Sequence, residues 1–503
     1  MKHLTSLRDY LATLDALGDL RVIDREVEAD LEIGAFARHT TETRGPAVLF
    51  DRVRGYRAGF RVLGGPASLS TVPGAPYARC AIALGLDPAT PPLQIMDGLT
   101  AAQDAAPVPP VVLDSGPCQD NVLLGDQADL DTFPIPLLHH GDGGSYVNTF
   151  GTFVLRSPDR SWTNWSIARA MKIDAHRMTG LILPVQHNGM IRELWREQGE
   201  PMPFALVQGA EPAVPFISGM ALPEHVNEAD YLGAYFGEPL QLVRCKTVDL
   251  EVPATAEIVI EGHVSLTEMA PEGPVGEYAG YVTTAPELRP VYHITAITHR
   301  NAPILPIVCA GKPVDEDHSL VALVNSAMWM HHLRAAGLPV TATWLIPESA
   351  IHIMAITVPR DWKQRSGATT SAAFCRAILD ACLTYPRVAC WLSRLMIIDD
   401  DIDPTDLRDV LWAFATRSHP THGVIPVDDV PILPLQVCYS AVERSTATGS
   451  KSIFDCLLPD GTGRPRSTAF ADNYPSETRH RVLDTWRSSA PAPGDDRVRP
   501  VKE

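Results

Sequence analysis

The apolar residues at the start of the chain recur at helical spacing. They lie between a Thr5 or Ser6 N-cap and Gly18, a typical helix stop: Leu7, Leu11, Leu14 and Leu17. This spacing predicts an amphipathic helix that packs its apolar face on the domain that follows.

Beyond this helix, short apolar runs separated by Gly and Pro predict strands, the first two at 47–50 and 61–63. From residue 149 onward, apolar and polar residues alternate with a period of two, which favours an antiparallel sheet or a small barrel. These later runs are 149–155, 181–183, 204–208, 257–264, 292–299 and 304–309. Helical spacing occurs at 78–84, 94–103, 189–198 and 228–236.

A longer helical pattern at 318–336 separates this β-rich part from a mixed part and is typical of a connector. The pattern after it indicates a separate α/β domain, with strands at 340–345, 352–358 and 395–398 and helices at 371–383 and 405–414. A last helix at 477–487 precedes a Pro-, Arg- and Asp-rich end, 488–503, which we expect to be frayed.

Composition and charge narrow the class of protein. The 503 residues are enough for two or three domains, and 45% apolar with 20% charged residues is typical of a soluble protein. A net charge of −18 argues against nucleic acid and against an anionic membrane surface. Nine scattered cysteines without a Cys-x-x-Cys pair favour reduced thiols. With no signal peptide and no apolar run long enough for a bilayer, we expect a cytoplasmic protein.

Asn164, His187 and Glu228 are candidate metal ligands. An amide oxygen, an imidazole nitrogen and a carboxylate suit Mn²⁺ or Mg²⁺ better than a structural zinc ion. The three residues lie far apart in the sequence, so each also has a structural interpretation. Asn164 would cap a strand, His187 would be a core histidine with satisfied hydrogen bonds, and Glu228 would sit in the first turn of its helix.

Arg169, Glu272 and Glu277 are candidate proton-transfer residues. Two carboxylates held close push their pKa values apart, and a nearby arginine keeps one of them ionised, so such a site has both an acid and a base. The alternative is a solvated acidic loop. In an extended strand Asn164 and Arg169 would face opposite ways. A shared site therefore needs a bend, or a cofactor long enough to touch both.

The sequence contains no Gly-x-Gly-x-x-Gly after a strand, no Walker loop, no nucleophile elbow and no His-Glu-x-x-His. Ser166 and Ser218 have no His and Asp arrangement that would mark a hydrolase. The Glu-Asp-His cluster at 316–318 could also carry chemistry, but we favour the interpretation that it forms the N-cap and first turn of the connector helix.

Taken in order, several segments of the chain resemble the UbiD family of decarboxylases, nearest the ferulic acid (phenylacrylic acid) decarboxylase branch. They are 164–169, Gln186-His187, Glu228, 272–277, 394–403, 409–417 and 456–459. Matches in the same order over nearly the whole chain favour the functional interpretation of these residues over the structural ones.

The resemblance implies an α+β and α/β architecture and a homodimer. Residues 1–311 would form a prenylated-FMN-binding domain, with an α/β part over about 1–125 and a split β-barrel over about 126–311. Residues 312–336 would be a linking helix, and 337–503 a C-terminal α/β dimerisation domain with a terminal helix. A cleft between two domains joined by a helix implies a hinge motion that opens and closes the site.

The resemblance also implies prenylated FMN as cofactor, with its phosphate bound through Mn²⁺ (or Mg²⁺) and K⁺. Asn164, His187 and Glu228 would ligate the divalent ion. Glu228, Ser218 and the backbone carbonyls of Trp165, Ile217 and Met220 would surround the potassium. The expected cofactor contacts are Thr149, Asn164, Ser166, Ile167, Ala168, Arg169, Gln186, His187, Ser218, Met220, Glu228 and Arg387. Arg387 stands where the family has a phosphate-contacting lysine, and the two are not interchangeable.

The implied reaction is a non-oxidative, reversible decarboxylation of an α,β-unsaturated or (hetero)aromatic monocarboxylic acid through 1,3-dipolar cycloaddition to the cofactor. The cofactor moves the electrons, and the protein positions and protonates. Glu277 would donate the proton, Arg169 would orient Glu277 and pair with the substrate carboxylate, and Glu272 would complete the network. CO₂ would be the second product.

The expected substrate pocket is apolar and has no second cationic anchor, which favours a monocarboxylic acid over a dicarboxylate. It would consist of Leu183, Gln186, Tyr278, Asp317, Val321, Cys390, Trp391, Val430 and Ile432. By the resemblance, Asp317 lies near the position from which heteroaromatic acid decarboxylases contact a ring N–H. It either binds a pyrrole- or indole-like acid or caps its helix.

Two alternatives remain open. One is a decarboxylase of a ring carboxylate, such as a pyrrole, indole, phenolic or polycyclic acid. The other is a flavin-phosphate-binding protein without turnover, which the intact Arg169, Glu272 and Glu277 argue against. Both enzyme hypotheses require a flavin prenyltransferase to supply the cofactor.

Overall fold

The computed structural model describes residues 3–283, 285–459 and 465–489. By their internal contacts they form two compact units, Met1–Cys456 and Leu457–Glu503. Most of the chain end predicted to be frayed, from residue 490 onward, lies outside the described residues.

The chain opens with α1 (Leu7–Ala16), as predicted, and the Ser6 hydroxyl caps it by accepting a hydrogen bond from the Asp9 N–H. The four-stranded sheet that follows has the order β1-β2-β3-β16. Its strands are β1 (Leu20–Ile23), β2 (Ala47–Phe50), β3 (Arg61–Gly64) and β16 (Ile304–Ile307). β16 therefore returns from far along the chain to pair in parallel with β3.

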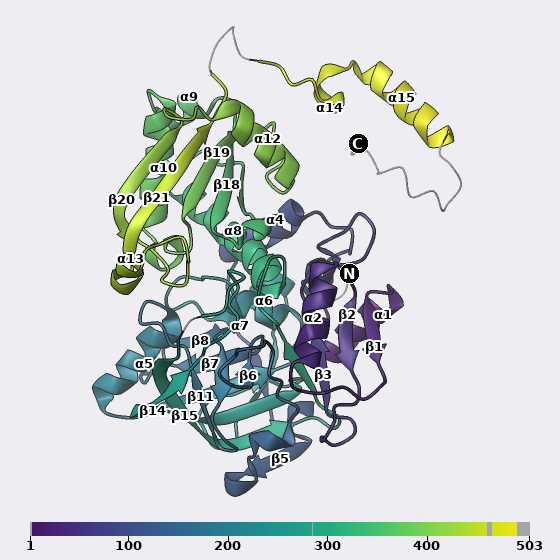
Figure 1. The fold of residues 1–503 in the computed structure, drawn as a ribbon, viewed down its shortest axis with the longest axis vertical. Helices are drawn as coiled ribbons and strands as arrows, with labels where there is room; N and C mark the ends of the chain where they lie inside the picture. The colour runs from purple at the N-terminus through teal and green to yellow at the C-terminus, as the bar shows by residue number, and fades with distance from the viewer. Residues whose placement is uncertain (1–2, 284, 460–464, 490–503) are drawn as a thin grey trace. The chain divides into compact units, whose positions relative to one another are not determined.

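The centre of the first unit is a nine-stranded antiparallel sheet with the order β6-β9-β10-β15-β14-β11-β7-β8, in which β5 also pairs with β15. This open, curved sheet confirms the predicted split-barrel fold class (Figure 1). Its strands are β5 (Asn121–Leu124), β6 (Tyr146–Asn148), β7 (Thr152–Arg156), β8 (Thr163–Ser166), β9 (Ala170–Lys172), β10 (Arg177–Gly180), β11 (Met202–Gln208), β14 (Ile258–Glu272) and β15 (Glu287–His299).

One core joins these two sheets. Buried side chains of β2, β3 and β16 pack in the same cluster as those of β7, β11, β14 and β15. Its largest members are aromatic and meet edge to face or tilted, which adds to the effect of burial: Phe60 with Phe133, and Phe153 with Phe204 and Tyr292.

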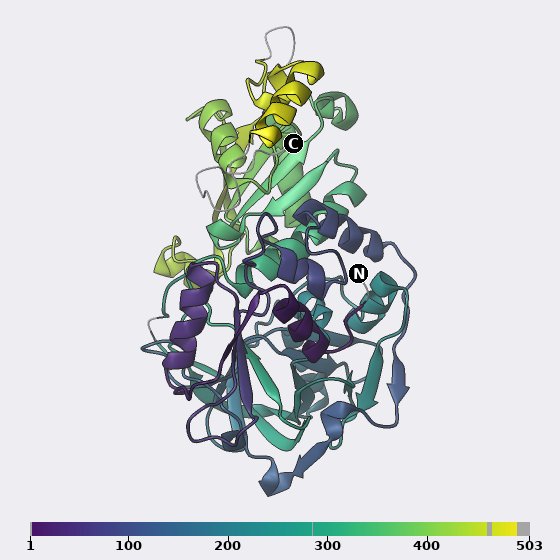
Figure 2. The same ribbon diagram turned by 90° about the vertical axis from the view of Figure 1, so that its right-hand side faces the viewer.

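Helix α8 (Glu316–Ala335) lies between the nine-stranded sheet and a five-stranded sheet, and its bounds agree with the helix predicted at 318–336 (Figures 1 and 2). The Asp315 side chain caps this helix. The five-stranded sheet has the order β17-β18-β19-β21-β20 and mixes parallel with antiparallel pairs. Its strands are β17 (Ala342–Leu345), β18 (Ile353–Val358), β19 (Arg394–Asp399), β20 (Val424–Pro431) and β21 (Thr448–Cys456).

The remaining elements of the first unit cover or connect these sheets. A small sheet has the order β13-β12-β4, with β4 (Val111–Leu113), β12 (Gln241–Arg244) and β13 (Glu251–Pro253). The helices are α2 (Glu32–Glu42), α3 (Ala78–Ala83), α4 (Pro92–Gln103), α5 (His187–Gln198), α6 (Ala213–Ser218), α7 (Glu228–Phe236), α9 (Trp362–Ser366), α10 (Ser371–Leu383), α11 (Pro386–Ala389), α12 (Leu407–Arg417) and α13 (Ala441–Thr446). The second unit contains α14 (Phe470–Asn473) and α15 (Ser476–Ser488).

Two sequence predictions are wrong. The strand expected at 181–183 does not form, because β10 ends at Gly180 and the chain turns toward α5. Pro184 lacks the N–H that a continued strand would need. Leu17 was placed on the buried face of the first helix, but it is the C-cap and its side chain is 42% exposed.

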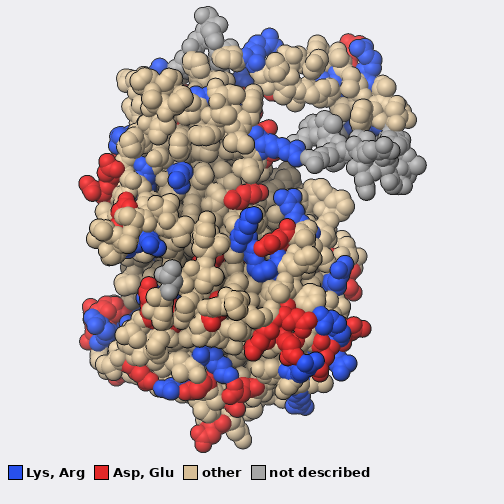
Figure 3. Space-filling view, in the orientation of Figure 1, with Lys and Arg blue, Asp and Glu red and all other residues tan. Residues whose placement is uncertain are grey.

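On the face seen in Figure 3, acidic and basic side chains lie interspersed. No helix among the described residues is long and apolar enough to cross a membrane.

Candidate active site

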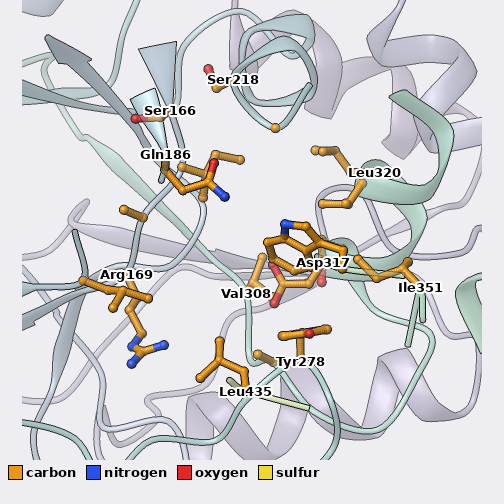
Figure 4. A pocket seen from close by; sticks show the side chains of 18 of the residues that line it. Ser166, Arg169, Gln186, Ser218, Tyr278, Val308, Asp317, Leu320, Ile351 and Leu435 are labelled. Atoms are coloured by element: carbon orange, nitrogen blue, oxygen red, sulfur yellow. The ribbon is translucent and has the colours of Figure 1, made fainter. Parts of the chain in front are cut away.

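A cavity of about 290 Å³ lies within the first unit, and most of its walls are apolar. One wall comes from β8, the segment after it and the start of α5. The opposite wall comes from α8 and from residues 387–392 and 433–435 of the C-terminal part. Figure 4 shows Ser166, Gln186 and Ser218 toward one end, with Arg169 and the Asp317 carboxyl away from them.

At one end of the cavity the structure brings Asn164, His187 and Glu228 together. The Asn164 Nδ2 atom donates to Glu228 Oε1 over 2.8 Å and lies 3.3 Å from His187 Nδ1. The backbone N–H of Trp165 donates to Glu228 Oε2 over 2.8 Å. All three side chains are buried, yet Asn164 Oδ1 and His187 Nε2 have no hydrogen-bond partner. Buried polar atoms without a partner are rare, and an amide oxygen and an imidazole nitrogen in this state are groups that can bind a metal ion.

The electrostatics of this end also fit a cation. Burial raises the pKa of Glu228 to about 8, and burial followed by the nearby Arg387 lowers the pKa of His187 to about 3. His187 is therefore neutral and able to ligate a metal, and a cation would stabilise the Glu228 carboxylate that burial disfavours. Among the described residues no three His, Cys, Asp or Glu side chains form a metal-binding group, because the third member here is an amide.

Further along the same wall, Arg169 binds both predicted carboxylates. Its Nε donates to Glu272 Oε1 over 2.8 Å and its Nη2 to Glu272 Oε2 over 3.0 Å, while Nη1 donates to Glu277 Oε1. Tyr146 donates its hydroxyl to Glu272 Oε1 over 2.8 Å. Tyr146 was not predicted, because no motif in the sequence marks it. The predicted triad is one network rather than a solvated acidic loop.

Glu277 is the member of this network suited to hold a proton. Burial raises its pKa, and the Arg169 charge only partly offsets that effect. Glu277 lines the cavity, whereas Glu272 lies behind it and is 2% exposed.

The structure also resolves the question of opposite faces. β8 ends at Ser166, and residues 167–169 form an irregular connection before β9. Because the strand stops there, Asn164, Trp165, Ser166, Ile167, Ala168 and Arg169 all line one cavity.

The other predicted cofactor contacts mostly reach the cavity: Thr149, Gln186, His187, Ser218, Met220 and Arg387. Arg387 donates to the Leu222 carbonyl over 2.6 Å and to the Tyr385 hydroxyl over 2.7 Å. Glu228 and Ile217 lie behind the wall, and the Ile217 carbonyl accepts the Met220 N–H over 3.0 Å.

Six predicted pocket residues line the cavity and three do not. Leu183, Gln186, Tyr278, Asp317, Val321 and Trp391 face it. Cys390, Val430 and Ile432 are buried but are not part of its wall. Val430 is held in β20 opposite Gly449, and the Leu433 N–H binds the Cys390 carbonyl over 3.0 Å. The cavity wall also contains apolar residues that no motif marks and that were not predicted: Val308, Leu320, Ile351, Leu433 and Leu435.

Asp317 does not cap its helix, since that role belongs to Asp315. Its carboxyl points into the cavity (Figure 4). Burial raises the pKa of this carboxyl well above its ordinary value, and the Asp315 charge raises it further. A carboxyl in an apolar cavity gains from any ligand that brings a hydrogen-bond donor.

Three family models cover most of the chain. Residues 11–99 match the N-terminal domain of 3-octaprenyl-4-hydroxybenzoate carboxy-lyase, residues 111–313 its Rift-related domain, and residues 318–456 its C-terminal domain. In chain order, these three domain models are called UbiD_N, UbiD and UbiD_C.

Similar proteins agree with these matches. The chain is 39% identical to a pyrrole-2-carboxylic acid decarboxylase of Pseudomonas aeruginosa, over 95% of this chain and 97% of that one. It is 34% identical to ferulic acid decarboxylase 1 of Saccharomyces cerevisiae, with the same coverage. An evolved dimeric form of the UbiD-class enzyme HmfF from Pelotomaculum thermopropionicum, in complex with prFMN, superposes with a TM-score of 0.76 at 27% identity, over 93% of this chain and 98% of that one.

Proposed function

The chain belongs to the UbiD family of carboxy-lyases, and on this basis we propose that it decarboxylates an α,β-unsaturated or (hetero)aromatic monocarboxylic acid with prenylated FMN, reversibly and without oxidation. One observation carries the proposal. The Arg169, Glu272 and Glu277 network lies on the wall of a cavity whose other end has unpartnered Asn164 and His187 atoms.

The residues of the chain have separable tasks in this reaction. Prenylated FMN, when bound, supplies the 1,3-dipole that takes up electrons as CO₂ leaves. Arg169 offers its guanidinium to the substrate carboxylate and orients Glu277 at the same time. Glu277, buried and with a raised pKa, gives its proton to the carbon that has lost CO₂. Glu272 and Tyr146 fix Arg169 from behind.

For the cofactor phosphate we propose a divalent ion, Mn²⁺ or Mg²⁺, on Asn164 Oδ1, His187 Nε2 and Glu228. The two buried atoms without a hydrogen-bond partner and the burial of Glu228, which raises the pKa of its carboxyl to about 8, support this set. We further propose K⁺ near Glu228, Ser218 and the carbonyls of Trp165, Ile217 and Met220. Arg387, which lines the same end, adds a permanent positive charge for the phosphate.

The second candidate substrate is an acid whose carboxylate is attached to a ring that contains an N–H group. The Asp317 carboxyl in the apolar cavity favours this substrate. A pyrrole or indole N–H would give this carboxyl a partner, which a cinnamate-type acid lacks. The P. aeruginosa relative is named for such an acid.

Co-expression with a flavin prenyltransferase, followed by a visible absorption spectrum and a product screen, tests the proposal. The screen contains cinnamate, sorbate, pyrrole-2-carboxylate and larger aromatic acids. We expect bound flavin and CO₂ release from at least one acid. A protein that binds no flavin would exclude both enzyme hypotheses, and bound flavin without turnover would favour a flavin-phosphate-binding protein.

The remaining proposals concern assembly and location. We propose a homodimer formed through the C-terminal part, with light scattering after gel filtration as its test. We also propose a cytoplasmic location, supported by nine cysteines that are all free thiols in the described residues.

A further inference from the structure

Two histidine–aspartate pairs lie on either side of the segment that carries Glu277. The first is His139 with Asp142, where Nδ1 and Oδ2 are 3.1 Å apart. The second is His318 with Asp315, where Nδ1 and Oδ1 are 2.8 Å apart. Neither pair belongs to the network of Arg169, and neither was expected from the sequence.

The first pair holds the residue before Glu277. Asp142 Oδ1 accepts the Gly276 N–H over 2.9 Å. The His139 ring packs so closely on Gly276 that a Cβ there would lie 2.5 Å from it. The neighbouring backbone adds to this contact, since the Gly143 N–H donates to the Pro274 carbonyl over 2.7 Å.

The second pair holds the residue after Glu277. His318 Nε2 lies 2.6 Å from the Tyr278 carbonyl oxygen. A carbonyl only accepts, so Nε2 carries the hydrogen in every protonation state of the ring. Burial opposes protonation of His318, but the Asp315 charge raises its pKa overall, which strengthens this donor.

The two pairs are tied to each other through Arg38. Its Nη1 donates to Asp315 Oδ2 over 2.8 Å and to the Cys309 carbonyl over 3.0 Å. The Cys309 Sγ lies 3.2 Å from His139 Nε2.

Cys309, His139 and Asp142 therefore lie in line as in a nucleophilic triad, but the cysteine is not suited to attack. Burial raises the pKa of its thiol, and the side chain does not face the cavity, although Val308 and Ala310 do. The protonated thiol instead donates to His139 Nε2, which leaves Nδ1–H for Asp142.

We propose that His139–Asp142 and Asp315–His318 are positioning pairs that fix the backbone on both sides of Glu277, and so place its carboxyl for proton delivery. The proposal rests on the proposed function in that Glu277 is taken as the proton donor. A misplacement of about 1 Å costs up to about 100-fold in rate, so a donor on a loop needs such support.

The test compares Asp142→Ala and His318→Leu with the wild type, all loaded with cofactor. We expect kcat to fall roughly ten- to hundredfold, with KM and the flavin spectrum little changed and the alkaline limb of the pH profile displaced. Asp142→Asn keeps an acceptor for Gly276 and His318→Gln keeps a donor for Tyr278, so both should recover most of kcat. The matched control is His331→Leu. His331 lies on α8 like His318, and the substitution removes its own contact with an aspartate, 2.9 Å from Nε2 to Asp104 Oδ1.

Hydrogen exchange of the peptide that spans Gly276 to Tyr278 provides a readout without turnover. The peptide should exchange faster in Asp142→Ala and His318→Leu, and not in His331→Leu. Unchanged exchange together with unchanged kcat in both variants would overturn the positioning role. If the wild type turns over no acid while the peptide still exchanges faster, the pairs stand and the proposed function fails. If the wild type is inactive and the peptide exchanges at the same rate in the variants, both the positioning role and the proposed function are overturned.

Discussion

At the scale of single residues, Glu277 has the surroundings of a proton donor. Burial raises its pKa, so the carboxyl keeps its proton to a higher pH than an exposed glutamate. Turnover should be full below that raised pKa and fall as the pH rises through it. Glu277→Gln should bind flavin normally and lose kcat by about 100-fold or more. A pH–rate profile and a flavin spectrum measure both, and full activity in the variant would end this role for Glu277.

Asp317 should set the preference between substrates. In Asp317→Ala the cavity loses this carboxyl, so an acid with a ring N–H loses its partner. We expect kcat/KM for pyrrole-2-carboxylate to fall about tenfold or more, because a ring N–H that is buried without a partner costs about 1–3 kcal/mol. For cinnamate it should stay level or rise. Asp317→Asn, which keeps an acceptor oxygen, is the control. An equal loss for both acids would mean that Asp317 acts on the fold and not on the substrate.

Residue types alone did not reveal this site. His187 and Glu228 lie 23 and 64 positions after Asn164, and each of the three residues had an ordinary structural explanation. Order and resemblance along the chain predicted the set, and the structure brings it together. Tyr146 and the two histidine–aspartate pairs were missed, because they act through contacts that only tertiary folding creates.

At the scale of elements, local patterns predicted those that a short window defines. α7 and α10 occur at the predicted bounds, and α1 has its predicted Ser6 cap. β1, β20 and β21 were missed, and the pairing of β16 with β3 could not be foreseen, because it joins residues more than two hundred positions apart. Such pairing depends on long-range contacts that no local periodicity encodes.

The start of β1 should depend on one buried ion pair. Arg79 on α3 donates to both carboxylate oxygens of Asp19, at 2.9 and 2.6 Å, and both side chains are fully buried. Arg79→Leu leaves Asp19 uncompensated, so we expect a loss of about 3–5 kcal/mol in the free energy of unfolding. Urea unfolding measures it. The control is Arg54→Leu, whose exposed pairs with Glu26 and Glu28 should contribute far less to the free energy of unfolding.

The same pair predicts a pH dependence. Burial raises the pKa of Asp19, but Arg79, together with hydrogen bonds from Ser70 and Thr71, outweighs this and the pKa is lowered overall. A carboxyl with a depressed pKa stabilises the fold above its unfolded pKa, and that contribution disappears as the pH falls through the folded value. Without Arg79, burial raises the pKa of Asp19 in the folded variant, so the stability difference between wild type and Arg79→Leu should shrink as the pH falls, beginning above the ordinary range of an aspartate near about pH 4 and continuing below it. A constant difference across this range would contradict the assignment.

At the scale of the whole molecule, the cavity joins parts of the chain that are remote in sequence. Its walls come from β8, α5, α8 and residues 387–392, so a bound cofactor would hold these elements together. A ligand that binds only the folded state stabilises it by about 2.7 kcal/mol at a hundred times its Kd. FMN with Mn²⁺ should therefore raise the Tm of the purified protein, and a chelator should reverse most of the shift.

The matched variant for this prediction is His187→Ala. It removes the unpartnered Nε2 but leaves the Arg169 network in place. We expect a smaller Tm shift with FMN and Mn²⁺ and no further effect of the chelator, because the site then lacks one of three ligands. The Tm without ligand should fall as well, because the buried ring leaves a cavity and its Nδ1 contact with Asn164 is lost, so the ligand-induced shift is compared within each protein. An undiminished, chelator-sensitive shift in His187→Ala would mean that the metal binds elsewhere and that the cavity end around Asn164 does not hold it.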